Sequence, residues 1–259
     1  MGTSSHNPGQ NGHTPLVPSW VDGEDGNIAA PIAPNGDSQR FSAARGNMTR
    51  FAESGNIRNF KNAISEYVGR STGGARKAVD RLGSARKSTA TLVGVLGAYS
   101  EGGAGAVQDY LKTYNLIGAP ADEAFRSITE LICGDGGTTD EGIARDAYID
   151  TLADMKELRG VQFEELLPNQ IMLFLEGCMA RIVVGKLLND IGNKTLSIPD
   201  SLRRVGNVKN RMINLVKGLI GDIAVRMNLS PDKIQKEKAQ SICDDVYERV
   251  YRSFQAAGK

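Results

Sequence analysis

The chain has 259 residues, of which 40% are apolar and 24% are charged, and its formal net charge is +1. These values are ordinary for a protein with a hydrophobic core, arranged as one large domain or two small ones. The longest apolar runs, 171–175 and 182–184, are much shorter than the roughly 18 residues that a membrane span needs. The sequence therefore predicts a soluble, cytoplasmic protein without a membrane partner.

The small net charge conceals strong segregation along the chain. Residues 1–39 carry four acids and no Lys or Arg, and residues 40–100 carry eleven Lys or Arg against three acids. Residues 101–176 carry five Lys or Arg against fifteen acids, and residues 177–259 carry fifteen against eight. This alternation indicates either internal charge pairing between segments or separate docking faces.

Residues 1–46 are predicted to form a long disordered tail rich in Gly, Pro and Asn, which begins with the head Met1–Ser5. No positive region or apolar run of the kind found in a signal peptide is present. Leu16, Val17 and Trp20 form an apolar cluster inside the tail, and Trp20 is the only Trp of the chain. Such a cluster typically docks, either on the body of the chain or on a partner.

Gly2 is the candidate reactive residue of the tail. A small residue at position 2 permits removal of Met1, which would leave Gly2 with a free α-amino group of pKa near 7.7–8.0. Met1-Gly2 also begins an N-myristoylation pattern, but His6 stands where that pattern requires Ser or Thr. Our hypothesis is that the tail is a substrate or key presented by the body, and the alternative is a tail that is merely disordered.

Apolar residues recur at helical spacing after the tail and predict an all-α, bundle-like domain over 47–257. Thr138-x-x-Glu141 is a capping-box pattern, Pro120 and Pro168 suit the first turn of a helix, and Ser230-Pro231 is expected to cap the last helix. Glycines 83, 94 and 97 could weaken their helix or permit close helix packing. A loop is expected at 102–105. The predicted helices are 57–69, 79–96, 107–114, 120–132, 138–155, 168–190, 202–223 and 231–254.

Catalytic, cofactor and metal functions are not predicted. The only histidines, His6 and His13, lie in the tail, so the body has no Ser-His or Cys-His pair, and two histidines alone make a weak metal site. Cys133, Cys178 and Cys243 show no C-x-x-C spacing and are predicted to be buried in a reducing cytosol.

Two further patterns have structural interpretations that we favour. Gly83–Thr89 resembles a phosphate loop, but Arg86 replaces its second glycine and no strand precedes it. Asp146, Asp150 and Asp154 are four residues apart on one helix face, where a polar or docking face is favoured over a Mg²⁺ site.

Six basic residues are candidates for contact with nucleic acid or with a protein partner: Arg70, Arg76, Lys77, Arg81, Arg86 and Lys87. Aromatic residues lie in the same segment, and the combination is typical of single-stranded nucleic-acid binding. No recognised nucleic-acid motif accompanies them, and Phe60 and Tyr67 also fit the core face of a helix. Pairing with the acidic segment 101–176, or with a partner, is therefore favoured over nucleic acid.

The chain resembles the QatB family in three segments: Met1–Ser5, Thr14–Trp20 and Gly69–Gly74. Proteins of this family are components of the Qat anti-phage defence system. The resemblance extends over the whole chain and is most specific in the head. It implies partners: an ATPase, a TatD-like nuclease and a QueC-like enzyme, of a class that activates a 7-deazaguanine carboxylate with ATP.

By this resemblance the chain is a non-catalytic adaptor and substrate whose tail enters the active site of the QueC-like enzyme. Gly2 would attack the activated acyl group and form an amide. Thr3, Ser4 and Ser5 would be recognised by the enzyme, together with Leu16, Val17 and Trp20. Trimming of the tail, and a nucleic-acid-binding subunit that uses residues 40–87, remain alternatives.

Overall fold

The computed structural model describes residues 39–191 and 202–258, which belong to one unit spanning residues 37–259. Within these residues the secondary structure is helical, and the only pairing of extended backbone is an isolated bridge between Pro120 and Gln162. The all-α prediction is thus confirmed for the described part of the chain. The predicted disordered tail lies almost entirely outside it, and helix α1 (Ser42–Ser54) begins before residue 47.

The other α-helices of the described residues are α2 (Ile57–Glu66), α3 (Ala75–Asp80), α4 (Ser84–Leu111), α5 (Ala121–Ser127), α6 (Thr129–Cys133), α7 (Thr139–Asp154), α8 (Pro168–Ile191), α9 (Leu202–Arg226) and α10 (Ala239–Ala257). Short 3₁₀ and π turns connect them: η1 (Tyr67–Ser71), η2 (Lys156–Leu158), η3 (Phe163–Glu165), η5 (Pro231–Lys233) and η6 (Lys236–Lys238). None of the helices in these residues is long and apolar enough to span a membrane.

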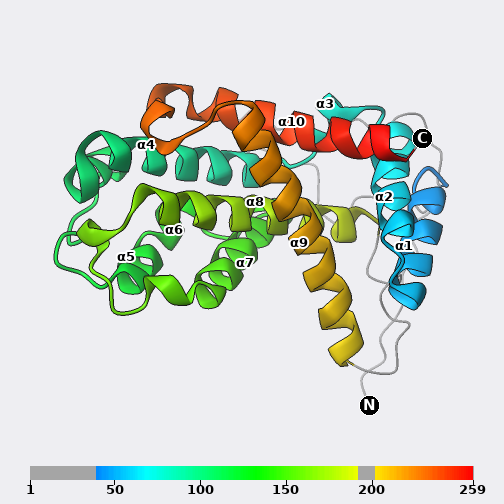
Figure 1. Cartoon of the computed structure of the whole chain (residues 1–259), viewed down its shortest axis with the longest axis horizontal. Helices are drawn as coiled ribbons and strands as arrows, with labels where there is room; N and C mark the ends of the chain where they lie inside the picture. The colour runs from blue at the N-terminus through cyan, green and yellow to red at the C-terminus, as the bar shows by residue number, and fades with distance from the viewer. Residues whose placement is uncertain (1–38, 192–201, 259) are drawn as a thin grey trace, which may run out of the picture. The chain divides into compact units, whose positions relative to one another are not determined.

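Helices α4 and α8 form the centre of the helical unit. Helix α7 packs against both of them, α9 crosses α8, and α10 lies along α4 and reaches α2 and α3 (Figure 1). Aromatic rings fill the space between α5, α7 and α8, where the Phe125 and Phe174 centroids are 4.6 Å apart and Tyr148 lies edge-on to Phe174. These rings are fully buried, so burial of apolar surface holds this part of the bundle together.

Two helix starts were predicted correctly from local signals. The Thr138 side chain accepts a hydrogen bond from the Glu141 backbone N–H, and the Glu141 carboxylate accepts one from the Thr138 N–H. This capping box opens α7 as expected. Helix α8 begins at Pro168, as predicted. Pro120 is the N-cap of α5 rather than its first residue.

Gly83 breaks the helix that was predicted over 79–96. Its φ is +54°, and a Cβ at this position would lie 2.0 Å from an Asp140 carboxylate oxygen. The chain therefore turns here, so that α3 and α4 are separate helices. The close contact at Gly83 is tertiary, because Asp140 belongs to α7 and comes from 57 positions further along the sequence.

Helix α4 is interrupted at Gly102 and Gly103, whose backbone angles are non-helical, so the loop expected at 102–105 is present as a kink. Upstream, Gly97 lies against the backbone of the η5–η6 segment: a Cβ would be 2.9 Å from the Ile234 carbonyl oxygen. Gly94 is covered by the Tyr110 ring, which returns after the kink. The prediction that these glycines permit close packing is confirmed.

Three other predicted helices differ from the structure. Residues 57–69 end as a regular helix at Glu66 and continue into η1. Ile128 is non-helical and divides 120–132 into α5 and α6. The last helix begins at Ala239, because the Ser230-Pro231 signal opens the short turn η5 instead of α10. Local capping patterns thus mark turns correctly but do not say whether a long helix follows.

Candidate functional site

The residues predicted to be modified or recognised in the tail lie outside the described residues: Gly2, Thr3, Ser4, Ser5, Leu16, Val17 and Trp20. The same holds for His6 and His13. The geometry of the body therefore tests the remaining candidates, which are the six basic residues, the acidic stripe, the cysteines and the cavities.

Arg81 and Arg86 are held inside the helical unit and are poorly placed to contact a partner. Both Nε and Nη2 of Arg81 bind Asp190 Oδ2, at 2.9 and 2.8 Å, and the Arg81 side chain is only 17% exposed. Arg86 lies near Asp80 and Asp244, with nitrogen–oxygen distances of 3.1 and 3.5 Å. Their internal pairing explains why these two basic residues occur in the segment.

Asp190 is the centre of a buried charge cluster that we name the polar junction: Tyr67, Arg81, Asp140, Lys186 and Asp190. The Tyr67 hydroxyl donates to Asp190 Oδ2 at 2.8 Å, and Lys186 Nζ is 2.7 Å from Asp140 Oδ1. Burial raises the pKa of Tyr67 well above its usual value, and the neighbouring Tyr251 and Asp190 raise it further. The junction joins η1, α7 and the C-terminal end of α8, so its role is structural.

Arg70, Arg76, Lys77 and Lys87 are exposed and remain available to a partner. Arg76 is 58% exposed and lies 3.5 Å from Glu248 of α10, which also binds Arg252. The Arg252 side chain was not predicted as a candidate; its signal is the i,i+4 spacing to Glu248. The exposed basic residues therefore flank α3 and extend onto α10.

Three of the four aromatic residues of the basic segment are not available for stacking on bases. Phe51, Phe60 and Tyr67 are fully buried, and Phe60 packs against Phe51 and against Phe254 of α10. These three rings belong to the core, as the helical spacing of Phe60 and Tyr67 had indicated, so bases cannot stack on them in this conformation. The fourth, Phe41, is partly buried against the core, and the Arg40 guanidinium lies 4.7 Å from its ring centroid.

Internal pairing between charge segments is confirmed, but the partners differ from those predicted. The basic residues of 40–87 pair with Asp190, Asp244 and Glu248, in the last third of the chain, rather than with the acidic segment 101–176. The acidic segment pairs instead with the C-terminal basic segment, in four ion pairs: Asp140–Lys186, Asp150–Lys209, Asp154–Arg181 and Glu101–Lys236. The packing of the helices, rather than the order of the segments along the chain, determines which charged residues pair.

The acidic stripe of α7 lies on an exposed face. Asp146, Asp150 and Asp154 are all exposed, and two of them pair with basic side chains of α8 and α9. Within the described residues no group of three or more His, Cys, Asp or Glu is arranged to hold a metal ion. The stripe therefore behaves as a polar face that ties neighbouring helices to α7.

Gly83–Thr89 does not have the geometry of a phosphate loop. Ser88, at the position of the hydroxyl that would bind Mg²⁺, is buried and donates a hydrogen bond to the Ser84 carbonyl at 3.4 Å. The next residue, Thr89, is also buried and shares a 2.8 Å hydrogen bond with the Tyr247 hydroxyl. The segment follows helix α3 rather than a strand. These contacts make it the first turn of α4 and part of the core.

All three cysteines are buried, as predicted, and none is in a disulfide. Burial raises the pKa of both the Cys133 and the Cys178 thiols to about 12, and it raises the pKa of Cys243 as well. At neutral pH these groups are protonated thiols, which are poor nucleophiles.

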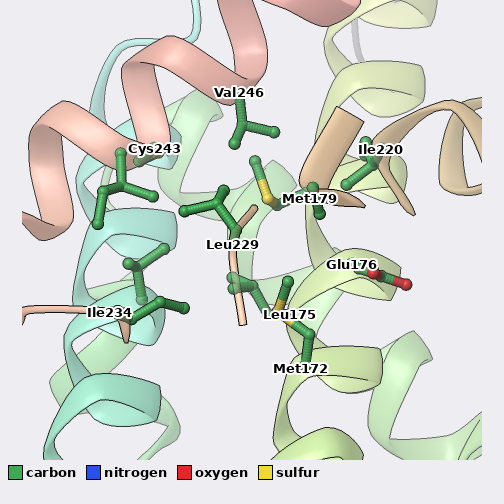
Figure 2. Close-up of a pocket in the computed structure, with 12 residues that line it drawn as sticks. Met172, Leu175, Glu176, Met179, Ile220, Leu229, Ile234, Cys243 and Val246 are labelled. Carbon is green, nitrogen blue, oxygen red and sulfur yellow. The ribbon is translucent and has the colours of Figure 1, made fainter. Parts of the chain in front are cut away.

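An apolar cavity of about 20 Å³ lies between α4, α8, α9 and α10, lined by residues that include Val93, Met179, Ile234 and Val246. This volume is about that of one water molecule, so the cavity is too small for a substrate. Figure 2 shows the Glu176 carboxylate directed away from the apolar side chains, and partial burial raises its pKa.

A second, open groove of about 530 Å³ lies between α5, α6 and α7. Its lining combines two basic residues, Arg126 and Arg145, with Ile149 and Leu152. Arg126 and Arg145 already lie near Asp122 and Glu130, at 3.3 and 3.5 Å. The buried Thr129 hydroxyl in its lining already donates to the Phe125 carbonyl at 3.3 Å, and both arginines lie near carboxylates, so few of its polar groups are left to fix a ligand.

The family model of QatB, described as Qat anti-phage system associated protein QatB, matches residues 73–254. No curated protein and no solved structure matches the chain. The match covers most of the chain, from α3 through almost all of α10. The chain belongs to the QatB family of Qat anti-phage system associated proteins.

Proposed function

We propose that this chain is a non-catalytic adaptor of the Qat system that presents Gly2 to a QueC-like partner enzyme. The observation that carries the proposal is the position of Gly2 directly after Met1. The family match over residues 73–254 supports it by making the chain a component of the Qat system, and the resemblance of the head Met1–Ser5 is part of the proposal. Removal of Met1 leaves an unhindered primary amine, of which roughly a tenth or more is neutral at pH 7. The tail is long enough to reach a partner: about 40 residues could span on the order of 100 Å if extended.

The proposed reaction is an acyl transfer. The QueC-like enzyme would activate the carboxylate of a 7-deazaguanine with ATP, and the Gly2 nitrogen would attack the activated carbonyl carbon. An amide bond forms, the bond to the ATP-derived leaving group breaks, and the attacking amine loses one proton. Thr3, Ser4 and Ser5 would bind in the enzyme as an extended polar strand, and Leu16, Val17 and Trp20 would anchor the tail.

The described body supports the adaptor part of the proposal. Its thiols are buried and protonated, its apolar cavity has a volume of only about 20 Å³, and both histidines lie in the tail. The proposal therefore assigns the reacting nucleophile to the Gly2 amine and the carrier role to the body.

Intact mass spectrometry of the full chain, expressed alone and with the QueC-like enzyme, tests the proposal. We expect a mass gain the size of a deazaguanine acyl group, confined to the N-terminal peptide and dependent on the enzyme. A mass loss in the same peptide would indicate trimming, and an unchanged peptide would contradict both.

Two variants separate the roles of the amine and of the space around it. Gly2→Trp retains Met1 and places a bulky side chain where the tail would enter the QueC-like enzyme, so it should abolish both the mass gain and protection against phage. Gly2→Ala still loses Met1 and keeps a primary amine, so it should retain a measurable mass gain. Full protection by Gly2→Trp would contradict the proposal.

Nucleic-acid binding is the second candidate function, favoured by the exposed residues Arg70, Arg76, Lys77 and Lys87. Since Phe51, Phe60 and Tyr67 are buried, binding would depend mainly on phosphate contacts, and its affinity would fall steeply with salt. Absence of binding to a 30-base-pair duplex at 50 mM salt would contradict this candidate.

A further inference from the structure

The loop at 112–119, between α4 and α5, exposes two large apolar side chains. Tyr114 is 81% exposed and Ile117 is 58% exposed, whereas Leu116 between them is fully buried. Leu116 anchors the loop in the core, and its two neighbours are directed into water. Exposed apolar side chains that lie singly need no explanation, but a pair on one loop is typical of a binding surface.

Hydrogen bonds fix this loop in one conformation. The Gln108 side-chain oxygen accepts from the backbone N–H groups of Leu116 and Ile117, at 2.8 and 3.3 Å. The Glu164 carboxylate accepts from the Gly118 N–H at 3.0 Å. Lys112 and Asn115 also adopt positive φ values, +53° and +66°, which are unfavourable for residues with a side chain.

These hydrogen bonds help to offset the cost of the positive φ values and hold the loop backbone in one conformation. A backbone that is already ordered loses less conformational entropy when a partner binds, which favours binding through the exposed side chains that it carries.

The segment 161–167 lies beside the loop and enlarges the exposed surface. The Phe163 N–H donates to the Ala119 carbonyl at 2.9 Å, and the Ala121 N–H donates to the Val161 carbonyl at 2.8 Å. Leu167, at the end of this segment, is 65% exposed. We name residues 112–119 and 161–167 together the loop surface.

Acidic side chains border the loop surface. Asp109, Glu164 and Glu165 are exposed on the two segments and on the last turn of α4, against one exposed ammonium group, that of Lys112. The local charge is therefore about −2, in the most acidic third of the chain. A second copy that used the same surface would place these carboxylates opposite one another, which is unfavourable.

We propose that the loop surface is a docking site for a protein partner that presents a basic segment with an apolar side chain. Tyr114, Ile117 and Leu167 would contact the apolar side chain at the centre, and the carboxylates would form the rim around the basic residues. Central aromatic residues surrounded by a charged rim are the usual energetic arrangement of a protein interface. This inference is independent of the conjugation at Gly2, because it involves no residue of the tail.

Site-specific photocrosslinking identifies the occupant. A benzophenone amino acid is placed at Ile117 of the full chain, in cells that also express the other components of its defence system. The matched control carries it at Val225, which is 79% exposed on α9. We expect a crosslink at Ile117, absent at Val225, to a peptide of a different protein that is net basic and contains a large apolar residue.

Crosslinks at Ile117 only to a second copy of the chain, or only to an acidic or wholly polar peptide, would overturn the proposal. An Ile117 signal no stronger than that at Val225 would also overturn it.

Surface variants supply an independent test with the same complex. Tyr114→Asp combined with Ile117→Asp should reduce the amount of co-purified partner at least tenfold, while Val225→Asp should leave it unchanged. Since all three side chains are exposed, the melting temperatures should match that of the parent chain. Unchanged co-purification by the folded double variant would overturn the proposal.

Charge reversal tests the basic character of the partner. Glu165→Lys should weaken co-purification several-fold at 50 mM salt and much less at 500 mM salt, because salt screens an exposed rim. Asp245→Lys on α10 is the matched control and should have no effect. Stronger binding by Glu165→Lys would overturn the proposed partner chemistry.

Discussion

The polar junction and the Gly97 contact hold the same helical unit by opposite means. At the junction, Asp190 and Lys186 of α8 are buried charged groups, and each is stabilised only by an oppositely charged neighbour: Arg81 pairs with Asp190, which also lies near Lys186. At Gly97, α4 approaches the η5–η6 backbone closely because a side chain is absent. Removal of the Asp190 carboxylate should destabilise the polar junction, whereas addition of a Cβ at Gly97 should destabilise the contact with η5–η6. Substitutions can therefore distinguish the two regions.

Removal of the central carboxylate should have the largest effect. Asp190→Ala leaves the buried Arg81 guanidinium and the Tyr67 hydroxyl without their acceptor, and we expect a loss of about 3–5 kcal/mol in the free energy of unfolding. Urea denaturation followed by circular dichroism measures this. Asp154→Ala is the control, because Asp154 pairs with Arg181 but is largely exposed and should cost less than about 1 kcal/mol. Equal losses would contradict the assignment.

Addition of one methyl group tests the second region. Gly97→Ala places a Cβ against the Ile234 carbonyl oxygen, and since backbone cannot move aside as a side chain can, we expect destabilisation of about 1–3 kcal/mol. Gly218→Ala on α9 is the matched control, because a Cβ there meets nothing within 4 Å. That variant should be neutral or stabilising by about 0.5–1 kcal/mol. Equal destabilisation by Gly218→Ala would mean that the close contact at Gly97 is not what distinguishes the two positions.

The buried thiols make the free energy of unfolding of the core depend on pH. Cys178 has a folded pKa of about 12, above its value of about 8.5 in the unfolded chain. Its contribution to stability is therefore fully present below about pH 8.5 and is lost as pH rises toward 12, because only the unfolded chain releases the proton. By pH 9.5 the loss from this thiol should be about 1 kcal/mol.

Comparison of the parent chain with Cys178→Ala isolates this effect. The difference between their urea midpoints at pH 7.5 and pH 9.5 measures it, and the variant should lose less stability over that interval. The same pH dependence in both proteins would contradict burial of a protonated thiol at this position.

The smallest effect is expected at the surface. Lys209 and Asp150 lie 3.6 Å apart and are each about half exposed, so Lys209→Ala should change stability by less than about 1 kcal/mol at low salt. The difference should disappear at 1 M salt, where the Debye length is about 3 Å. A loss comparable to that of Asp190→Ala would remove the distinction between buried and exposed pairs.

The candidate sites could be predicted only in part. Helical spacing correctly indicated that Phe60 and Tyr67 belong to the core, and the lack of C-x-x-C spacing correctly indicated buried cysteines. The division of the basic residues into internal and exposed groups could not be predicted, because it depends on where Asp190 and Asp244 arrive in space. Nothing local marks Tyr114 as exposed either, since the loop that carries it is held in part by Glu164 from a distant segment, whose carboxylate accepts from the Gly118 N–H.

Local sequence patterns were sufficient to predict the all-α body, the capping box of α7 and the start of α8 at Pro168. These features depend on contacts within a few residues. The close contact at Gly83, the ion-pair partners of each charged segment and the side chains that remain exposed could be learned from the folded chain alone. These depend on pairs of atoms far apart in the chain, such as Gly83 with Asp140, and packing alone brings them together.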